Sequence, residues 1–164
     1  MFDPFFVWLE TTALSVWLVE SPSLFAFPGI LAAHTVGLGL LAGLSAALDL
    51  RLLGVAPGIS PAAFVRLRPV MWFGFWLNLT SGLLLLLAYP TKALTNPVFY
   101  LKLGLIGVAL IVLRAQLRAA RDGWTGPGTT RLAVLSLVVW AGAITAGRLL
   151  AYTCTRLTVE YRCS

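Results

Sequence analysis

Residues 25–48 read FAFPGILAAHTVGLGLLAGLSAAL, and this apolar stretch determines the fold of the chain. It has the length and composition of a helix that crosses a bilayer, which needs about 20 apolar residues. It also contains His34, the single histidine of the sequence. An imidazole in hydrocarbon is costly, so we expect His34 to have a partner or a function there. Histidine is also well suited to bind haem or a metal, or to move a proton near neutral pH.

The composition of the whole chain is typical of a membrane protein. Of its 164 residues, 59% are hydrophobic and 11% are charged, with a mean hydropathy of +0.90. A soluble domain carries about 25% charged residues. The net charge is +6, but the basic residues are spread between apolar runs and form no basic arm or helix face, which argues against nucleic-acid binding. The N-terminus has the acidic Asp3 where a cleavable signal peptide has basic residues, so we expect no such peptide.

The sequence predicts an all-α integral membrane four-helix bundle that forms a single membrane domain over residues 1–164. The spans are expected at about 25–48, 69–89, 97–117 and 132–152, separated by segments rich in Pro, Gly and Thr. Residues 3–19 differ, because apolar side chains recur at helical spacing while Glu10 interrupts them. They predict an N-terminal amphipathic interfacial helix, with a re-entrant helix as the alternative. Residues 153–164 form a tail.

The basic residues predict the orientation in the membrane. Seven arginines lie in or beside the connections between spans 1 and 2 and between spans 3 and 4: Arg51, Arg66, Arg68, Arg114, Arg118, Arg121 and Arg131. The opposite side has fewer basic residues: Lys92, Arg156 and Arg162. By the positive-inside rule the Arg-rich loops are cytoplasmic. We therefore expect a multi-pass protein of a bacterial inner membrane with both termini in the periplasm.

Both cysteines, Cys154 and Cys163, fall in the tail on the predicted outer side. The periplasm permits disulfide formation. We predict a bridge between Cys154 and Cys163, with two unpaired thiols as the alternative.

Four polar side chains in the spans should lie at similar depth, in the middle or outer half of the bilayer. They are His34, Asn78, Lys102 and Arg148, one on each span. Together they predict a polar pocket for a cofactor, a quinol or a metal ion, with His34 as ligand or proton acceptor. Alternatives exist: the lysine and arginine can extend to the headgroups, and the histidine can bond Asn78 or a backbone carbonyl.

Two further patterns concern packing. Asp49 and Arg51 lie at the inner end of span 1, where we expect the carboxylate to pair with an arginine, since an unpaired charge there is costly. Small residues recur as Gly39-x-x-x-Gly43 on span 1 and as Gly142-x-x-x-Ala146 on span 4. Such stripes allow close helix packing, either within the bundle or between two copies.

Several segments resemble a family of small bacterial inner-membrane proteins of unknown function. The segments are AHTVGLGLLAG (33–43), LDLRLLG (48–54), GLLL (82–85), NPVFYLK (96–102) and WAGAITAGRLLAY (140–152). The resemblance implies a four-helix bundle with a histidine in span 1, which is loosely similar to b-type cytochromes and copper-resistance membrane proteins. Relatives often carry a second histidine near the inner end of span 3, where this chain reads VLRAQ (112–116). A haem held by two histidines of one chain is therefore excluded.

These observations favour a non-enzymatic membrane component, working as a homo-oligomer or as part of a larger membrane complex. The alternative is a redox protein that binds haem b or a quinone at His34, with the histidine acting alone, with a non-histidine ligand, or with a second chain. A metal or solute carrier is a third, weaker hypothesis.

Overall fold

The computed structural model describes residues 3–123, 126–152, 155–156 and 161–162, and it is an all-α bundle. Within these ranges, four helices are long and apolar enough to cross a membrane: Phe27–Leu52, Arg68–Ala88, Pro97–Arg121 and Pro127–Leu150. We refer to them as spans 1 to 4. The predicted all-α fold with four helices long and apolar enough to cross a membrane is confirmed, and the ends of these helices differ by a few residues from the predicted spans.

The elements follow one another along the chain with short connections. They are α1 (Asp3–Glu10), α2 (Ala13–Glu20), α3 (Phe27–Leu38), the π-helix η1 (Gly39–Gly43), α4 (Leu44–Leu52), α5 (Pro61–Arg66), α6 (Arg68–Ala88), α7 (Pro90–Leu94), α8 (Pro97–Arg121), α9 (Pro127–Tyr152), β1 (Thr155–Arg156) and β2 (Tyr161–Arg162). Span 1 consists of α3, η1 and α4. Proline occupies the first turn of α5, α6, α7 and α8, where its missing N–H costs nothing.

The N-terminal segment forms two helices instead of the single one predicted over residues 3–19. The break lies at two threonines whose hydroxyls bond the preceding turn: Thr11 donates to the Trp8 carbonyl (2.8 Å) and Thr12 to the Leu9 carbonyl (2.7 Å). Such bonds compete with the helical backbone pattern. Thr12 also caps α2 by accepting from the Ser15 N–H. Threonine pairs inside an apolar pattern therefore end one helix and begin the next.

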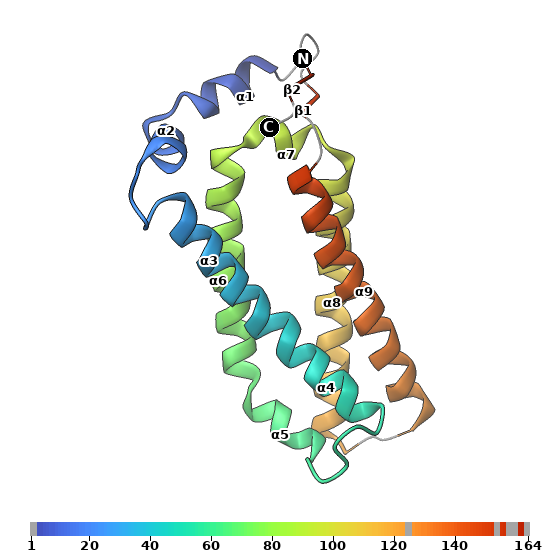
Figure 1. Ribbon diagram of the computed structural model, residues 1–164. Helices are drawn as coiled ribbons and strands as arrows, with labels where there is room; N and C mark the ends of the chain where they lie inside the picture. Colours follow the sequence, from blue (N-terminus) through green and yellow to red (C-terminus); the bar gives the residue numbers. More distant parts are fainter. Residues whose placement is uncertain (1–2, 124–125, 153–154, 157–160, 163–164) are drawn as a thin grey trace.

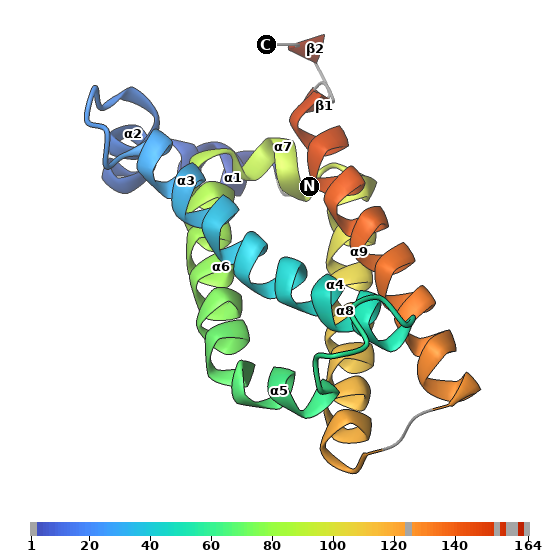
Figure 2. The ribbon, with the colours of Figure 1, turned by 60° about the horizontal axis from the view of Figure 1, so that its bottom comes forward.

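Span 1 crosses the molecule diagonally and connects α6 to the pair formed by α8 and α9. Its first half, α3, packs against α6, and its second half, α4, packs against α9, which in turn lies along α8. Figure 1 shows this path from α6 to the α8–α9 pair, and Figure 2 shows the same crossing from another side. Helices α1, α2 and α7 lie at one end of the bundle and α5 lies at the other (Figure 1). We call these the α7 end and the α5 end.

The crossing of α3 over α6 depends on two glycines at the point of closest approach. A Cβ atom placed on Gly37 would lie 2.6 Å from the Asn78 nitrogen and 2.8 Å from the Gly74 carbonyl oxygen. One placed on Gly74 would lie 2.7 Å from Leu40 Cβ and 2.9 Å from the Gly37 carbonyl oxygen. Two helix backbones approach this closely only where side chains are absent.

Most of the surface of the spans remains exposed. Only 22%, 17%, 17% and 33% of the most apolar window of spans 1 to 4 is buried inside the chain. The buried core is small and lies where span 1 meets the other spans, around Leu41, Leu48, Met71, Leu113 and Trp140. The exposed remainder is apolar, with Phe73, Ile111 and Val138 more than 60% exposed. Helices with such surfaces fit contact with a lipid bilayer.

The glycine contact gives a direct stability test. We expect Gly37→Ala to lower the free energy of unfolding by about 1–3 kcal/mol, because the new methyl group meets backbone atoms that cannot move aside. The matched control is Gly107→Ala on span 3, where a Cβ would have no atom within 4 Å. Thermal unfolding of both variants in detergent measures the difference. Equal melting temperatures would contradict the assigned crossing.

Candidate functional site

His34 and Asn78 join spans 1 and 2 through reciprocal hydrogen bonds. The Asn78 amide Nδ2 donates to the His34 carbonyl oxygen at 2.8 Å. In the other direction, His34 Nδ1 lies 3.1 Å from the Asn78 carbonyl oxygen. Each side chain therefore bonds the backbone of the facing helix. Both residues are half-buried, and they follow the Gly37–Gly74 contact toward the α7 end.

The partners of His34 determine which ring nitrogen carries the proton. A carbonyl oxygen can only accept, so Nδ1 is the donor toward Asn78. The Ser81 hydroxyl lies 3.2 Å from the same nitrogen but already donates to the Leu77 carbonyl at 2.5 Å, so it also faces Nδ1 as an acceptor. In the neutral imidazole, Nε2 is then the nitrogen with a free lone pair. It makes no hydrogen bond to any residue that the structure describes.

Gly82 provides the space for the imidazole ring. A Cβ at this position would lie 3.2 Å from His34 Cε1 and 3.5 Å from Nδ1. The order Asn78, Ser81 and Gly82 follows helical spacing, which brings all three to the face of α6 that meets α3. The sequence indicated Asn78 by its depth, but it gave no signal for Gly82 as the floor of the site.

Lys102 approaches this group and Arg148 does not. The Lys102 ammonium acts electrostatically on His34, and its side chain runs over α9, with Cε and Nζ 3.6 and 3.7 Å from a Cβ placed on Gly147. Arg148 is exposed and has no hydrogen bond or ion pair with the described part of the chain. The structure thus brings His34, Asn78 and Ser81 into contact, places Lys102 nearby and leaves Arg148 on the surface.

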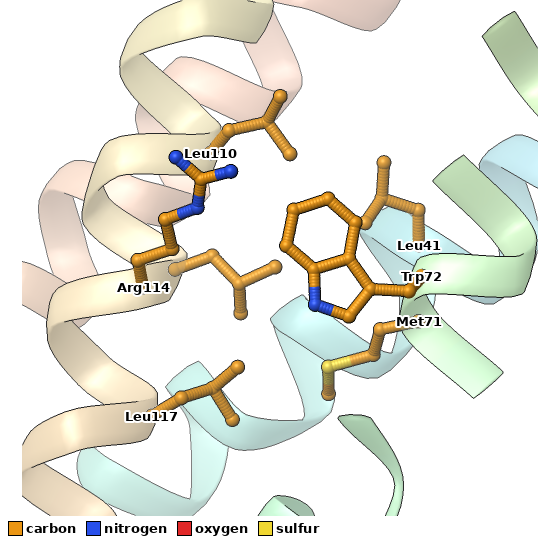
Figure 3. Close-up of a pocket in the computed structure, with 7 residues that line it drawn as sticks. Leu41, Met71, Trp72, Leu110, Arg114 and Leu117 are labelled. Carbon is orange, nitrogen blue, oxygen red and sulfur yellow. The ribbon is translucent and has the colours of Figure 1, made fainter. Parts of the chain in front are cut away.

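An apolar hollow lies elsewhere in the bundle, between α6, α8 and span 1. Its volume is about 10 Å³, the size of one water molecule. The walls are formed by Leu41, Met71, Trp72, Leu110, Leu113, Arg114 and Leu117. Figure 3 shows Arg114 of α8 facing the indole of Trp72, whose ring centre lies 5.2 Å from the guanidinium carbon. This contact is a cation–π interaction that closes the hollow.

The predicted ion pair between Asp49 and Arg51 is wrong. Arg51 instead donates to two carbonyl oxygens of the following loop, those of Pro57 and Ile59. Asp49 is fully buried on the other side of α4 and accepts from Gln116 Nε2 at 2.5 Å. Residues two apart on a helix face different directions, so the carboxylate and the guanidinium cannot meet.

Asp49 belongs to a buried polar cluster at the junction of α4, α8 and α9. Ser45, Asp49, Gln116 and Ser136 are all 0% exposed. Trp140 Nε1 donates to Ser45 Oγ at 3.1 Å, and Ser45 Oγ lies 3.4 Å from Ser136 Oγ. The depth argument that grouped His34 with Asn78 could have found this cluster, because its members all lie toward the α5 ends of their spans.

Metal binding has little support in the part of the chain that is described. No group of three or more His, Cys, Asp or Glu side chains is close enough there to hold an ion. Among the described residues, His34 is not part of such a group. The predicted bridge between Cys154 and Cys163 lies outside the described residues.

Comparisons of the chain with models of protein families, with curated proteins and with solved structures find no match.

The reciprocal bonds of His34 and Asn78 predict that the stability losses of the two single variants add in the double variant. Each of His34→Ala and Asn78→Ala removes bonds to the backbone of the facing helix while the other side chain keeps its own. We expect each to lower the free energy of unfolding by about 1 kcal/mol. Each bond ends on a backbone carbonyl that the other substitution leaves in place, so the double variant should lose about the sum of the two single losses.

Thr80→Ala is the control, because the Thr80 hydroxyl bonds only carbonyls of its own helix. Reversible unfolding in mixed detergent provides the measurement. A double variant no less stable than the single ones would show that the two side chains depend on each other, contrary to this geometry.

Proposed function

We propose that the chain is a non-enzymatic multi-pass protein of a bacterial inner membrane, which works as a homo-oligomer or as a subunit of a larger membrane complex. The observation that carries the proposal is the reciprocal pairing of His34 and Asn78. Two of the four polar groups expected to form a pocket, His34 and Asn78, instead bond the backbone of the facing helix across spans 1 and 2. Such bonds hold membrane helices together.

The distribution of arginines supports the orientation within this proposal. At the α5 end, the connection between spans 1 and 2 and its flanks carry Arg51, Arg66 and Arg68. The connection between spans 3 and 4 and its flanks carry Arg118, Arg121 and Arg131. The positive-inside rule assigns this end to the cytoplasm. The α7 end would then face the periplasm, where the predicted Cys154–Cys163 bridge can form.

The glycines of η1 support association with a second copy. A Cβ placed on Gly39 or on Gly43 would have no atom within 4 Å. The Gly39-x-x-x-Gly43 stripe is therefore not used for packing in the described part of the chain, whereas Gly142 of α9 does face Leu105 of α8. Of the two roles open to this stripe, contact between copies is the one we propose.

Cross-linking through span 1 tests the association. In a background with both native cysteines replaced by serine, we expect Gly39→Cys and Gly43→Cys to form disulfide-linked dimers in lipid under mild oxidation. Val138→Cys on span 4 is the control for random collision, because this side chain is 64% exposed. Dimer yields no higher than that of the control would contradict self-association through η1.

A second candidate function is haem b or quinone binding at His34, and one observation favours it. The Nδ1–H group points to the Asn78 carbonyl, and Nε2 makes no hydrogen bond to the described residues, so its lone pair is available to a ligand. Ligating histidines usually donate their second ring nitrogen to a carbonyl or carboxylate in this way, which orients the ring. A haem would then take one His34 from each of two copies.

The visible spectrum of the purified protein separates the two candidates. Under the non-enzymatic proposal, we expect no Soret band, and none after incubation with haem. A Soret band that is lost in His34→Ala but kept in Thr80→Ala would establish the haem protein instead. Thr80 is a suitable control because it lies two residues from Asn78 on α6 and has no contact with the imidazole.

A further inference from the structure

Two buried oxygen atoms in the cluster around Asp49 lack hydrogen-bond partners. They are Asp49 Oδ2 and Gln116 Oε1, which find none among the residues that the structure describes. Each belongs to a side chain that is 0% exposed. The two side chains are already joined through their other atoms, since Gln116 Nε2 donates to Asp49 Oδ1 at 2.5 Å. If the carboxyl group were ionised, Asp49 Oδ2 and Gln116 Oε1 would both be hydrogen-bond acceptors, with no proton to share between them.

Among the residues that the structure describes, no cation is placed to neutralise an ionised Asp49. On its own helix, Arg51 is bonded to loop carbonyls. The basic side chains of the elements packed around the cluster are Arg66 on α5, Lys102, Arg114, Arg118 and Arg121 on α8, and Arg131 and Arg148 on α9. All of them except Lys102 are exposed, and Lys102 lies toward the opposite end of α8. The polar groups of the cluster around the carboxyl are neutral: Gln116 donates to it, and Ser45 and Ser136 lie in the same buried cluster.

We propose that Asp49 and Gln116 form a proton-binding site, in which the carboxyl group holds a proton on Oδ2 at neutral pH and donates it to Gln116 Oε1. The acid and the amide then make two antiparallel hydrogen bonds, Nε2–H to Oδ1 and Oδ2–H to Oε1. A single proton satisfies both unpaired oxygens. It also removes the cost of a bare charge in an apolar interior, which is far larger than that of a hydrogen-bonded neutral acid.

The site goes beyond the proposed function, which concerns His34 toward the other end of span 1. It joins α4 to α8 beside the contact of α4 with α9. Loss of the proton would leave a negative charge there with no counter-ion. The site therefore holds its proton unless the helices separate, and it makes the packing of α4 dependent on protonation.

Infrared spectroscopy tests the proton directly. The chain has three aspartates, Asp3, Asp49 and Asp122, so ¹³C labelling of aspartate identifies the signal. We expect the carbonyl band of a protonated carboxylic acid at neutral pH, shifted by the label and by deuterium exchange, and absent in Asp49→Asn. Asp122→Asn is the control, because Asp122 is exposed at the end of α8. The absence of such a band from the wild-type protein would overturn the proposal.

Thermal stability provides a second, independent readout. Asn at position 49 can donate its amide to Gln116 Oε1 and accept from Nε2, so Asp49→Asn should stay within about 2 °C of the wild type. Gln116→Leu should lower the melting temperature by roughly 5 °C or more, because it leaves the acid unpaired.

The competing result is that a metal cation, and not a proton, is bound by these two oxygens. In that case the wild-type melting temperature would rise with sodium concentration at constant ionic strength, and Asp49→Asn would abolish the dependence. We expect no difference between sodium and choline chloride in either protein.

Discussion

The close approach of Gly37 and Gly74 is the contact on which the rest of the structure depends. It lets α3 lie directly on α6, so that side chains as short as asparagine and histidine reach the opposite backbone. The diagonal path of span 1 starts from this point and carries α4 across to α9. Without a hydrophobic driving force between helices in lipid, such backbone proximity and the bonds it permits are the main sources of cohesion.

The two polar groups of span 1 illustrate two ways in which a membrane bundle accommodates polar atoms. The group around His34 uses backbone carbonyls as partners, which are available on every helix. The cluster around Asp49 uses side chains only, from three different elements. The first arrangement tolerates the loss of one member, whereas the second leaves buried atoms without partners as soon as one side chain or one proton is removed.

The sequence predicts the spans well because length and apolar composition are sufficient for a helix to cross a bilayer. It also identified the His34–Asn78 pair through depth along the helix. The failures within the spans have one cause, which is that a sequence fixes the depth of a residue but not the direction it faces. Asp49 was paired with Arg51 beside it, although the carboxyl group faces Gln116 on another span. For the same reason, Gly37 and Gly74 were not recognised as the helix-packing glycines. The Gly39-x-x-x-Gly43 spacing was the more visible pattern, although a Cβ on either of these glycines would meet no atom within 4 Å.

The π-helix η1 lies between the two groups on span 1. A turn of π-helix holds more residues than a turn of α-helix, so it changes the angular relation between the segments before and after it. In an unbroken α-helix each residue advances by about 100°, and the faces carrying His34 and Asp49 would be tied to one fixed phase. The wider turn changes this phase, so α3 can face α6 while α4 faces α9. The length of this single turn therefore sets the rotational offset between the two halves of the bundle.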